Sequence, residues 1–214
     1  MNPQPLLILG TTPYALVFAD AFSDLPQFQV TGFVENLDRQ RCGQNHGGLP
    51  VHWVDDIAPL RDTHAVICCL STTHRDRFVR QVKELGFPFA TLIHPTATVS
   101  KKSTLAEGTS LNIGCIVAGF TTIGRYVQIN RGVNIGHHTT IEDYVTIQPG
   151  ANIAGNCHLG PQTYIGIGAT VVDGIKIGAH SVIGAGSVVT KDVPDRVLVV
   201  GVPAKVVKEG IEGK

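Results

Sequence analysis

His137 is the residue of this sequence whose surroundings best suit chemistry. It lies in the segment Ile135-Gly-His-His-Thr-Thr140, and glycines stand 18 residues before and after it, at Gly119 and Gly155. If an 18-residue repeat stacks these positions, the imidazole has open space beside it, as a bound ligand requires. Imidazole exchanges protons near neutral pH, so the position suits proton transfer. The alternative is an ordinary solvated histidine at a surface corner.

Other kinds of catalytic site find little support. The sequence has no paired Asp or Glu constellation, no Gly-x-Ser-x-Gly motif and no Cys/His arrangement for nucleophilic catalysis. Its 5 cysteines show no Cys-x-x-Cys or Cys/His spacing, and Cys68 and Cys69 are adjacent inside an apolar run. We therefore expect reduced, buried thiols, a cytoplasmic protein and no metal site.

Composition excludes several classes of protein. The 214 residues include 17 Lys and Arg against 17 Asp and Glu, so no basic surface points to nucleic acid or to a membrane. The longest early apolar run, Leu6 to Leu9, is too short for a signal peptide or a membrane span. Aromatic residues make up only 6% of a chain that is 43% hydrophobic, so small aliphatic side chains must build the core.

A six-residue repeat explains that core and positions His137. From Ile93 to Val189 an aliphatic residue occupies every sixth position, 17 times without an insertion. The residue four positions later is always small or β-branched, and the residue directly after is often Gly, Asn or Ala. No helix or hairpin strand has this period, whereas a coil of three short strands does. The sequence predicts a parallel β-helix of 18-residue coils, in which the Gly or Asn after each aliphatic residue supplies the unusual corner backbone.

The residues before the repeat alternate between strand and helix patterns. Strands are expected at Leu6–Leu9, Phe28–Val34 and Ala65–Leu70, and helices at Tyr14–Phe22 and Thr73–Leu85. This order predicts a small parallel sheet with flanking helices, whose ligand crevice lies at the C-terminal ends of the strands.

The loops after these strands form the expected crevice, at Gly10–Tyr14, Glu35–Asn36 and Ser71–Thr73. The loops lack the glycine pattern of dinucleotide sites and that of a P-loop, and a structural unit without a ligand is the alternative. At the other end, Asp195–Lys214 contains a strand-like run and Gly201-Val-Pro-Ala-Lys205. We expect this tail to cover the open end of the β-helix.

Several stretches resemble one known family. The repeat with Gly201-Val-Pro-Ala-Lys205 resembles the hexapeptide acyltransferases, and the whole chain resembles the PglD/NeuD-type sugar O-/N-acetyltransferases. The specific stretches are Leu92-Ile-His-Pro95, Ile129-Asn130, Ile135-Gly-His137, Pro149-Gly-Ala151, Ala154-Gly-Asn156 and Ile183-Gly-Ala-Gly-Ser-Val-Val-Thr-Lys-Asp192. The resemblance implies a left-handed β-helix, acetyl-CoA as cosubstrate and a homotrimer. It divides the chain into a Rossmann-like α/β substrate-binding domain (1–92), a β-helix acyltransferase domain (93–194) and a C-terminal capping tail (195–214).

The resemblance also implies roles for individual residues. It makes His137 the general base and Asn130 an active-site asparagine one corner earlier. The family usually has an acidic residue directly after the base, where this chain has His138. Acetyl-CoA contacts are implied at Thr146, which replaces a family histidine, and at Gly155, Ile167 and Ala185. Contacts with the nucleotide-linked substrate are implied at Gly10, Thr12, Pro13, Tyr14, Glu35, Asn36, Ser71 and Thr72.

The expected function is acetyl-CoA-dependent N-acetylation of a nucleotide-linked amino sugar, of the UDP-4-amino-4,6-dideoxy sugar type, in surface glycan biosynthesis. An amine attacks the thioester carbonyl, His137 removes the proton, and a backbone N–H stabilises the oxyanion. The alternatives are O-acetylation of a sugar hydroxyl, for example of a sialic acid, and a non-enzymatic β-helix that binds a ligand or partner. No nucleic-acid partner and no membrane insertion are expected.

Overall fold

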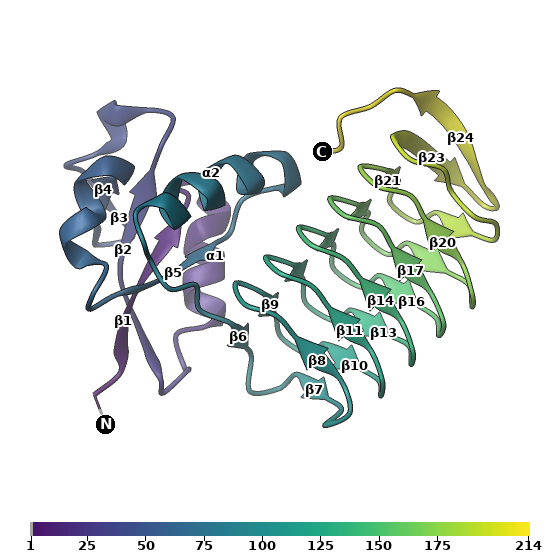
Figure 1. The fold of residues 1–214 in the computed structure, drawn as a ribbon, viewed down its shortest axis with the longest axis horizontal. Coiled ribbons are helices and arrows are strands. Elements are labelled where there is room, and N and C mark those ends of the chain that lie inside the picture. Colours follow the sequence, from purple (N-terminus) through teal and green to yellow (C-terminus); the bar gives the residue numbers. More distant parts are fainter. Residues whose placement is uncertain (1) are drawn as a thin grey trace.

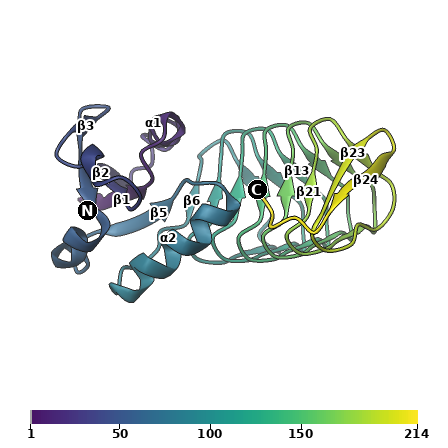
Figure 2. The same cartoon turned by 90° about the horizontal axis from the view of Figure 1, so that it is seen from above.

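The structure is a computed structural model that describes residues 2–214, without the side chains of Thr72 and Thr73. An α/β unit at one end is followed by a stack of coils, and the last strands of the chain lie at the far end of that stack (Figure 1). Seen from above, the coils follow one another as nearly parallel turns (Figure 2). The predicted combination of an α/β unit with a parallel β-helix is confirmed.

Five strands and two helices form the α/β unit. The sheet has the order β3-β4-β2-β1-β5, in which only the β3–β4 pair is antiparallel. Its strands are β1 (Gln4–Leu9), β2 (Phe28–Glu35), β3 (Asn45–His46), β4 (Leu49–Trp53) and β5 (Ala65–Cys68). Its helices are α1 (Pro13–Ala21) and α2 (Thr72–Glu84), with the 3-10 turns η1 (Arg39–Arg41) and η2 (Val54–Leu60).

The apolar run at β1 is continuous because helices cover both faces of the sheet. Side chains alternate along a strand. Leu6 and Ile8 therefore pack with α1, through Phe18, and Leu7 and Leu9 pack with α2. The strands β3 and β4 were missed by the pattern, because they are short, partly exposed and interrupted by a proline.

Two-residue strands form the three faces of the coil stack, and all pairs between coils are parallel. Face 1 contains β6 (Leu92–Ile93), β9 (Ser110–Leu111), β12 (Gln128–Ile129), β15 (Thr146–Ile147), β18 (Tyr164–Ile165), β21 (Val182–Ile183), β23 (Val197–Gly201) and β24 (Ala204–Glu209). Face 2 contains β7 (Thr98–Val99), β10 (Ile116–Val117), β13 (Asn134–Ile135), β16 (Asn152–Ile153), β19 (Thr170–Val171) and β22 (Val188–Val189). Face 3 contains β8 (Thr104–Leu105), β11 (Thr122–Ile123), β14 (Thr140–Ile141), β17 (His158–Leu159) and β20 (Lys176–Ile177).

The small position of each hexad does more than leave room in the core. The hydroxyls of Thr109, Thr121 and Thr139 are buried and donate hydrogen bonds of 2.8–3.1 Å to backbone carbonyls 15 residues further on. These bonds tie each coil to the next inside the apolar core. A hydroxyl is tolerated there because it has a partner.

The unusual corner backbone lies elsewhere than predicted. A positive φ recurs every sixth residue from Gly108 to Gly186, three residues after the aliphatic residue rather than directly after it. The glycines directly after it serve close packing instead. A Cβ at Gly136 would lie 2.4 Å from the backbone of Ala154 in the next coil. Gly is needed there for the approach of two backbones, not for its φ.

Three of the hydrogen bonds that join the α/β unit to the coils are made by Gln128, Arg75 and Tyr14. Gln128 donates to the carbonyl of Cys68 at 2.8 Å, and Arg75 donates to the carbonyl of Tyr144 at 3.0 Å. The third runs from Tyr14 to a corner of the β-helix and is described below. The α/β unit therefore covers the part of face 1 that β9, β12 and β15 form.

The tail extends face 1 and then turns back. β23 pairs in parallel with β21, and β24 pairs with β23 in an antiparallel hairpin. Residues 210–214 then run back towards α2, beside which the chain ends in both views (Figures 1 and 2). No helix within residues 2–214 is long and apolar enough to cross a membrane.

Candidate active site

His137 and His138 lie on the corner between faces 2 and 3, directly after β13. Their Nδ1 atoms are 3.0 Å apart, and both side chains are exposed. His138 has a φ of 55°, and its ring stacks on that of Phe120 with the ring centroids 4.9 Å apart. Phe120 occupies the same corner one coil earlier, so an exposed aromatic ring holds the His138 ring in place.

Gly155 lies directly against the imidazole of His137. A Cβ at Gly155 would lie 2.8 Å from Cε1 and 3.0 Å from Nε2 of that ring. The backbone N–H of Asn156 donates to the carbonyl of His137 at 2.8 Å, which fixes the two coils in register. Glycine at this 18-residue spacing thus leaves room for the imidazole of His137, and a carboxylate oxygen of Asp173 lies near the same point. Gly119, in contrast, would place a Cβ 3.3 Å from Ser100.

Asn130 lies on a different corner, between faces 1 and 2, and is buried. Its Oδ1 accepts a hydrogen bond of 2.6 Å from the hydroxyl of Tyr14, and its Nδ2 donates to the carbonyl of Ile147 at 3.3 Å. Burial raises the pKa of the Tyr14 hydroxyl to about 12, so it stays a donor. Within one chain Asn130 faces the α/β unit and does not contact His137.

A pocket of about 460 Å³ opens between the α/β unit and face 1, and we call it the interdomain pocket. It brings together Thr12, the N-cap of α1, and Ser71, the N-cap of α2. None of its described lining residues is Asp or Glu. They are Thr12, Tyr14, Leu37, Cys69, Leu70, Ser71, His74, Gln128, Asn130, Thr146, Gln148, Tyr164 and Lys214.

A smaller cavity of about 100 Å³ adjoins the end of β2, lined by Gly10, Glu35 and Asn36 among others. Glu35 is buried there, and its carboxylate accepts hydrogen bonds from Thr11 and from the backbone N–H groups of Asn36 and Leu37. Burial raises the pKa of Glu35, but these bonds outweigh it and lower the pKa overall. Glu35 therefore holds the loop together as an anion.

Arg75 of α2 is 1% exposed and lies beneath the interdomain pocket. Its Nη2 donates to the hydroxyl of Thr146 and to the carbonyl of Tyr144, whereas its Nε and Nη1 are buried with no hydrogen-bond partner among the described residues. Burial lowers the pKa of the guanidinium to about 10. The buried guanidinium of Arg75 thus places a positive charge next to the wall of the interdomain pocket.

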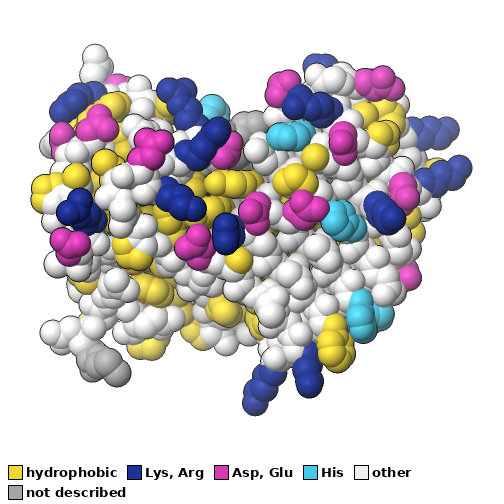
Figure 3. Space-filling view, viewed as in Figure 1, with side chains coloured by type: hydrophobic (Ala, Val, Ile, Leu, Met, Phe, Trp, Pro, Cys, Tyr) yellow, Lys and Arg dark blue, Asp and Glu magenta, His cyan; other side chains and the backbone are white. Residues whose placement is uncertain are grey.

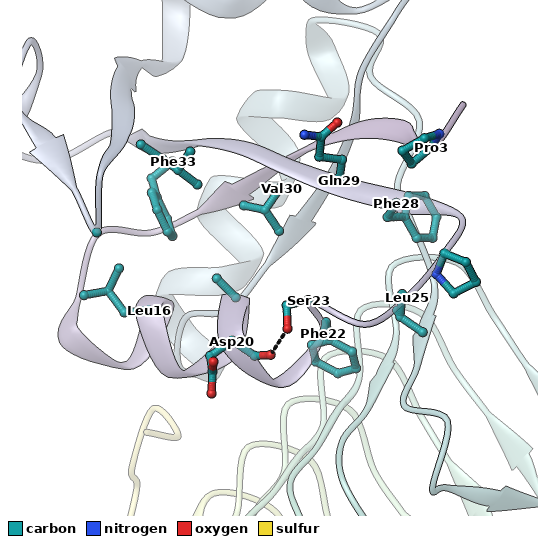
Figure 4. A pocket seen from close by; sticks show the side chains of 14 residues that line it. Pro3, Leu16, Asp20, Phe22, Ser23, Leu25, Phe28, Gln29, Val30 and Phe33 are labelled. Atoms are coloured by element: carbon teal, nitrogen blue, oxygen red, sulfur yellow. Dashed lines mark hydrogen bonds between the residues drawn. The ribbon is translucent and has the colours of Figure 1, made fainter. Parts of the chain in front are cut away.

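A separate hollow lies between α1 and β2 (Figure 4). Apolar side chains such as Phe22, Leu25 and Phe28 line most of it, and Ser23 donates to the backbone carbonyl of Asp20 at 2.8 Å. No residue singled out from the sequence lines this hollow. Within the described residues no group of three or more His, Cys, Asp or Glu could hold a metal ion.

Comparison with known proteins agrees with this geometry. The bacterial transferase hexapeptide (six repeats) family matches residues 120–155 and 156–191, and no curated protein matches the chain. A histidine-to-asparagine variant of perosamine N-acetyltransferase from Caulobacter crescentus, solved with CoA and GDP-perosamine, is 28% identical, with a TM-score of 0.87 over 96% of this chain and 97% of that chain. The acetyltransferase domain of PglB from Neisseria gonorrhoeae, solved with acetyl coenzyme A, is 26% identical, with a TM-score of 0.87 over 96% and 100%. WeeI from Acinetobacter baumannii is 26% identical, with a TM-score of 0.83 over 94% and 99%.

This chain is an acetyltransferase with hexapeptide repeats, and its sequence and fold are similar to those of PglD/NeuD-type sugar N-acetyltransferases. Its coil stack is the left-handed parallel β-helix that the resemblance implied, and acetyl-CoA is its cosubstrate.

In this acetyltransferase, the four residues implied for acetyl-CoA binding lie on two different corners and on one face of the β-helix. Gly155 shares the corner of His137, whereas Ile167 and Ala185 are exposed on the corner between faces 1 and 2. Thr146 lies on face 1 under Arg75 and joins the interdomain pocket instead. A single chain therefore does not bring these four residues together.

The residues implied for the substrate fall into the two cavities at the α/β unit. Gly10, Thr12, Glu35 and Asn36 line the smaller one, and Thr12 lines the interdomain pocket as well. Tyr14 and Ser71 line the interdomain pocket, and Pro13 begins α1. The side chain of Thr72 lies outside the described part of the chain.

Sequence reasoning missed several residues of the interdomain pocket and its wall, among them Gln148, Tyr164 and Arg75. Gln148 and Tyr164 follow the hexad pattern and carry no separate signal, and Arg75 is one of several arginines in α2. Only docking of α2 onto face 1 buries Arg75, so no local pattern could have marked it.

Proposed function

We propose that this acetyltransferase N-acetylates a nucleotide-linked amino sugar, with His137 as the general base. The observation that carries the proposal is the 3.0 Å contact between the Nδ1 atoms of His137 and His138. A neutral imidazole has one N–H, so one of these atoms donates and the other accepts. With His137 as the donor, its Nε2 keeps a lone pair beside Gly155, and a carboxylate oxygen of Asp173 lies near the same glycine.

The proposed reaction balances without a covalent enzyme intermediate. The amine of the sugar attacks the carbonyl carbon of the acetyl thioester, and Nε2 of His137 takes one proton from the nitrogen. A backbone N–H stabilises the oxyanion, which collapses and expels the CoA thiolate. The products are the acetamide and, once the thiolate takes up the proton, the CoA thiol. General base catalysis of this kind contributes about 10²–10⁴-fold to the rate.

The interdomain pocket supports an anionic acceptor. No Asp or Glu is among its described lining residues, and the guanidinium of Arg75 contacts Thr146 in its wall. The first turn of α2 starts at this pocket, and Ser71 makes no side-chain cap there, so the N-terminus of this helix suits an anion. A sugar linked to a nucleoside diphosphate carries such an anion. GDP-perosamine is the ligand named for the Caulobacter crescentus relative.

We propose a division of labour that follows the sequence analysis. Residues 1–92 bind the nucleotide-linked sugar, residues 93–194 carry out acyl transfer, and residues 195–214 form the C-terminal cap. His137 and Asn130 are the catalytic pair of the second part, with His138 as the group that orients His137. The UDP-4-amino-4,6-dideoxy sugar stays a prediction, since a GDP-linked amino sugar satisfies the same contacts.

We also propose a homotrimer, because His137 and Asn130 lie on different corners of one coil. In a trimer, the corner of one copy that carries His137 can face the corner of a neighbouring copy that carries Asn130, and the two together complete the site. On the face drawn in Figure 3, the lower part of the coil stack shows few charged side chains, and most lie on the α/β unit, on the upper part of the stack and at its edges. Exposed apolar side chains on face 2 and its two corners suit such contacts: Ile113, Ile116, Phe120 and Ile167.

The test is a thiol-release assay with acetyl-CoA against UDP-, dTDP- and GDP-linked amino sugars and free sialic acid. We expect release with a nucleotide-linked amino sugar, which His137→Ala reduces and His158→Ala, a control on face 3, does not. Release with sialic acid alone would instead establish O-acetylation. The absence of thiol release with every acceptor of the panel would favour the alternative of a non-enzymatic protein that binds a ligand.

A further inference from the structure

Residues 210–214 form a strap that lies against face 1 on its way back to the α/β unit. The backbone N–H of Ile211 donates to the carbonyl of Arg196 at 3.0 Å, and the carboxylate of Glu212 pairs with the same arginine at 2.7 Å. Val182 and Leu198 of face 1 line a hollow together with strap residues. The strap is thus fixed by its residues Ile211 and Glu212, and its last residue, Lys214, extends beyond the β23–β24 hairpin towards the interdomain pocket.

Lys214 reaches the interdomain pocket at the end of this strap. Its Nζ lies 4.6 Å from the ring centroid of Tyr164 and 3.4 Å from the hydroxyl of that residue. Both residues line the pocket together with Tyr14 and Ser71 of the α/β unit. The strap therefore brings a positive charge from the end of the chain to residues that are at least 50 positions away in sequence.

The charge of Lys214 has no acidic partner among the described residues. Within residues 2–214 the ammonium group of Lys214 forms no ion pair with Asp or Glu, and no described lining residue of the pocket is Asp or Glu. The cation–π contact with Tyr164 orients the ammonium group but leaves its remaining N–H donors free. Arg75 adds a second, buried charge of the same sign at the pocket wall. An ammonium group in such surroundings suits a phosphate group.

We propose that Lys214 binds a phosphate of the nucleotide-linked acceptor, and that residues 210–214 hold it over the mouth of the interdomain pocket. This inference rests on the proposed function. The acceptor is favoured over acetyl-CoA as the source of the phosphate, because Thr12, Tyr14 and Ser71 of the α/β unit share the pocket with Lys214. Lys214 then determines affinity for the acceptor, and the chemistry at His137 is untouched.

The test measures the binding of UDP, GDP and acetyl-CoA to the full-length protein by titration calorimetry. We expect Lys214→Met to weaken the nucleoside diphosphate that the wild type binds by about five- to twentyfold. Lys214→Arg restores most of this loss, and affinity for acetyl-CoA stays within about twofold. Glu212→Ala, which removes the ion pair between the strap and Arg196, weakens binding of the same diphosphate by a smaller factor. Lys205→Met, an exposed lysine of β24 outside the pocket, is the matched control.

Three results would overturn the inference. Equal diphosphate affinity in the wild type and Lys214→Met would show that the ammonium group makes no phosphate contact. A loss confined to acetyl-CoA would assign the phosphate to the acyl donor. Wild-type protein that binds neither diphosphate, yet transfers acetyl to an acceptor without phosphate, would refute the proposed nucleotide-linked substrate itself. The first two results leave the proposed function standing, so the two failures are distinguishable.

Discussion

The hydroxyl of Tyr14 donates a 2.6 Å hydrogen bond to Oδ1 of Asn130, 116 positions further along the chain. It joins the first turn of α1 to a corner of the β-helix, at the floor of the interdomain pocket. The α/β unit and the β-helix are therefore in direct contact through these two side chains.

Removal of this bond should cost stability in a way that depends on both residues. Tyr14→Phe and Asn130→Ala together are expected to show a coupling of about 1 kcal/mol in a double-mutant cycle of urea unfolding. Additive effects of the two substitutions would show that the bond does not stabilise the fold.

The same bond predicts a pH dependence. Burial raises the pKa of Tyr14 to about 12 from its usual value of 10.0. A raised pKa in the folded state means that the contribution is complete below pH 10.0 and is lost as the pH rises towards about 12. The difference in unfolding free energy between wild type and Tyr14→Phe should therefore shrink as the pH is raised above 10. A difference that stays constant over this window would contradict the prediction.

His137→Ala should lower kcat by about 10²–10⁴-fold, because it removes the only proposed proton acceptor. The melting temperature should change little, since the side chain is exposed at a corner. Steady-state assays and thermal unfolding of the same preparations check both parts. Unreduced thiol release would exclude His137 as the base.

His138 should act through its Nδ1 atom as a positioning residue. His138→Phe keeps an aromatic ring against Phe120 but removes the acceptor for His137, and we expect kcat to fall about tenfold or more with an unchanged KM. His138→Glu supplies a carboxylate acceptor and should retain most of the activity. Equal kcat values for the two variants would show that the contact does not orient the base.

Gly155→Ala tests the space beside His137. The new methyl group would lie 2.8 Å from Cε1 of the imidazole, so the ring must move and kcat should fall about ten- to a hundredfold. Gly119→Ala is the matched control on the same corner, two coils before Gly155. There the new methyl group would have the hydroxyl oxygen of Ser100, 3.3 Å away, as its nearest neighbour. A similar loss in both variants would point to general damage to the corner.

Arg75 should contribute to stability through its packing and its bonds to β15. Arg75→Ala removes the donor and leaves a cavity, and we expect a loss of about 3 kcal/mol in the free energy of unfolding. Arg75→Met fills most of the space without a buried charge and should cost less than half of that. Arg77→Ala, an exposed neighbour on α2, should stay within about 0.5 kcal/mol of wild type. Equal losses for the Ala and Met variants would contradict this account.

The hexad pattern determined the β-helix because each coil is a local structure. The aliphatic series from Ile93 to Val189 fixes an 18-residue register, and that register alone placed Gly155 next to His137. In the α/β unit, the continuous apolar run at β1 predicted a strand that is buried on both faces of the sheet. The pattern did not identify the corner residues with positive φ, because Gly after an aliphatic residue signals close packing as well as a special φ.

Tertiary structure alone decided how the two parts meet. The contacts of Tyr14 with Asn130, of Arg75 with Thr146 and of Lys214 with Tyr164 join residues at least 50 positions apart. Each of these contacts depends on how the α/β unit docks onto the β-helix or on how the chain turns back after β24. Neither arrangement produces a repeated pattern in the sequence. The repeat places Thr146 on face 1 and Gly155 on the corner of His137, and docking of the α/β unit then covers Thr146 at the interdomain pocket. The repeat fixes which corner a residue occupies, and docking decides what that corner faces.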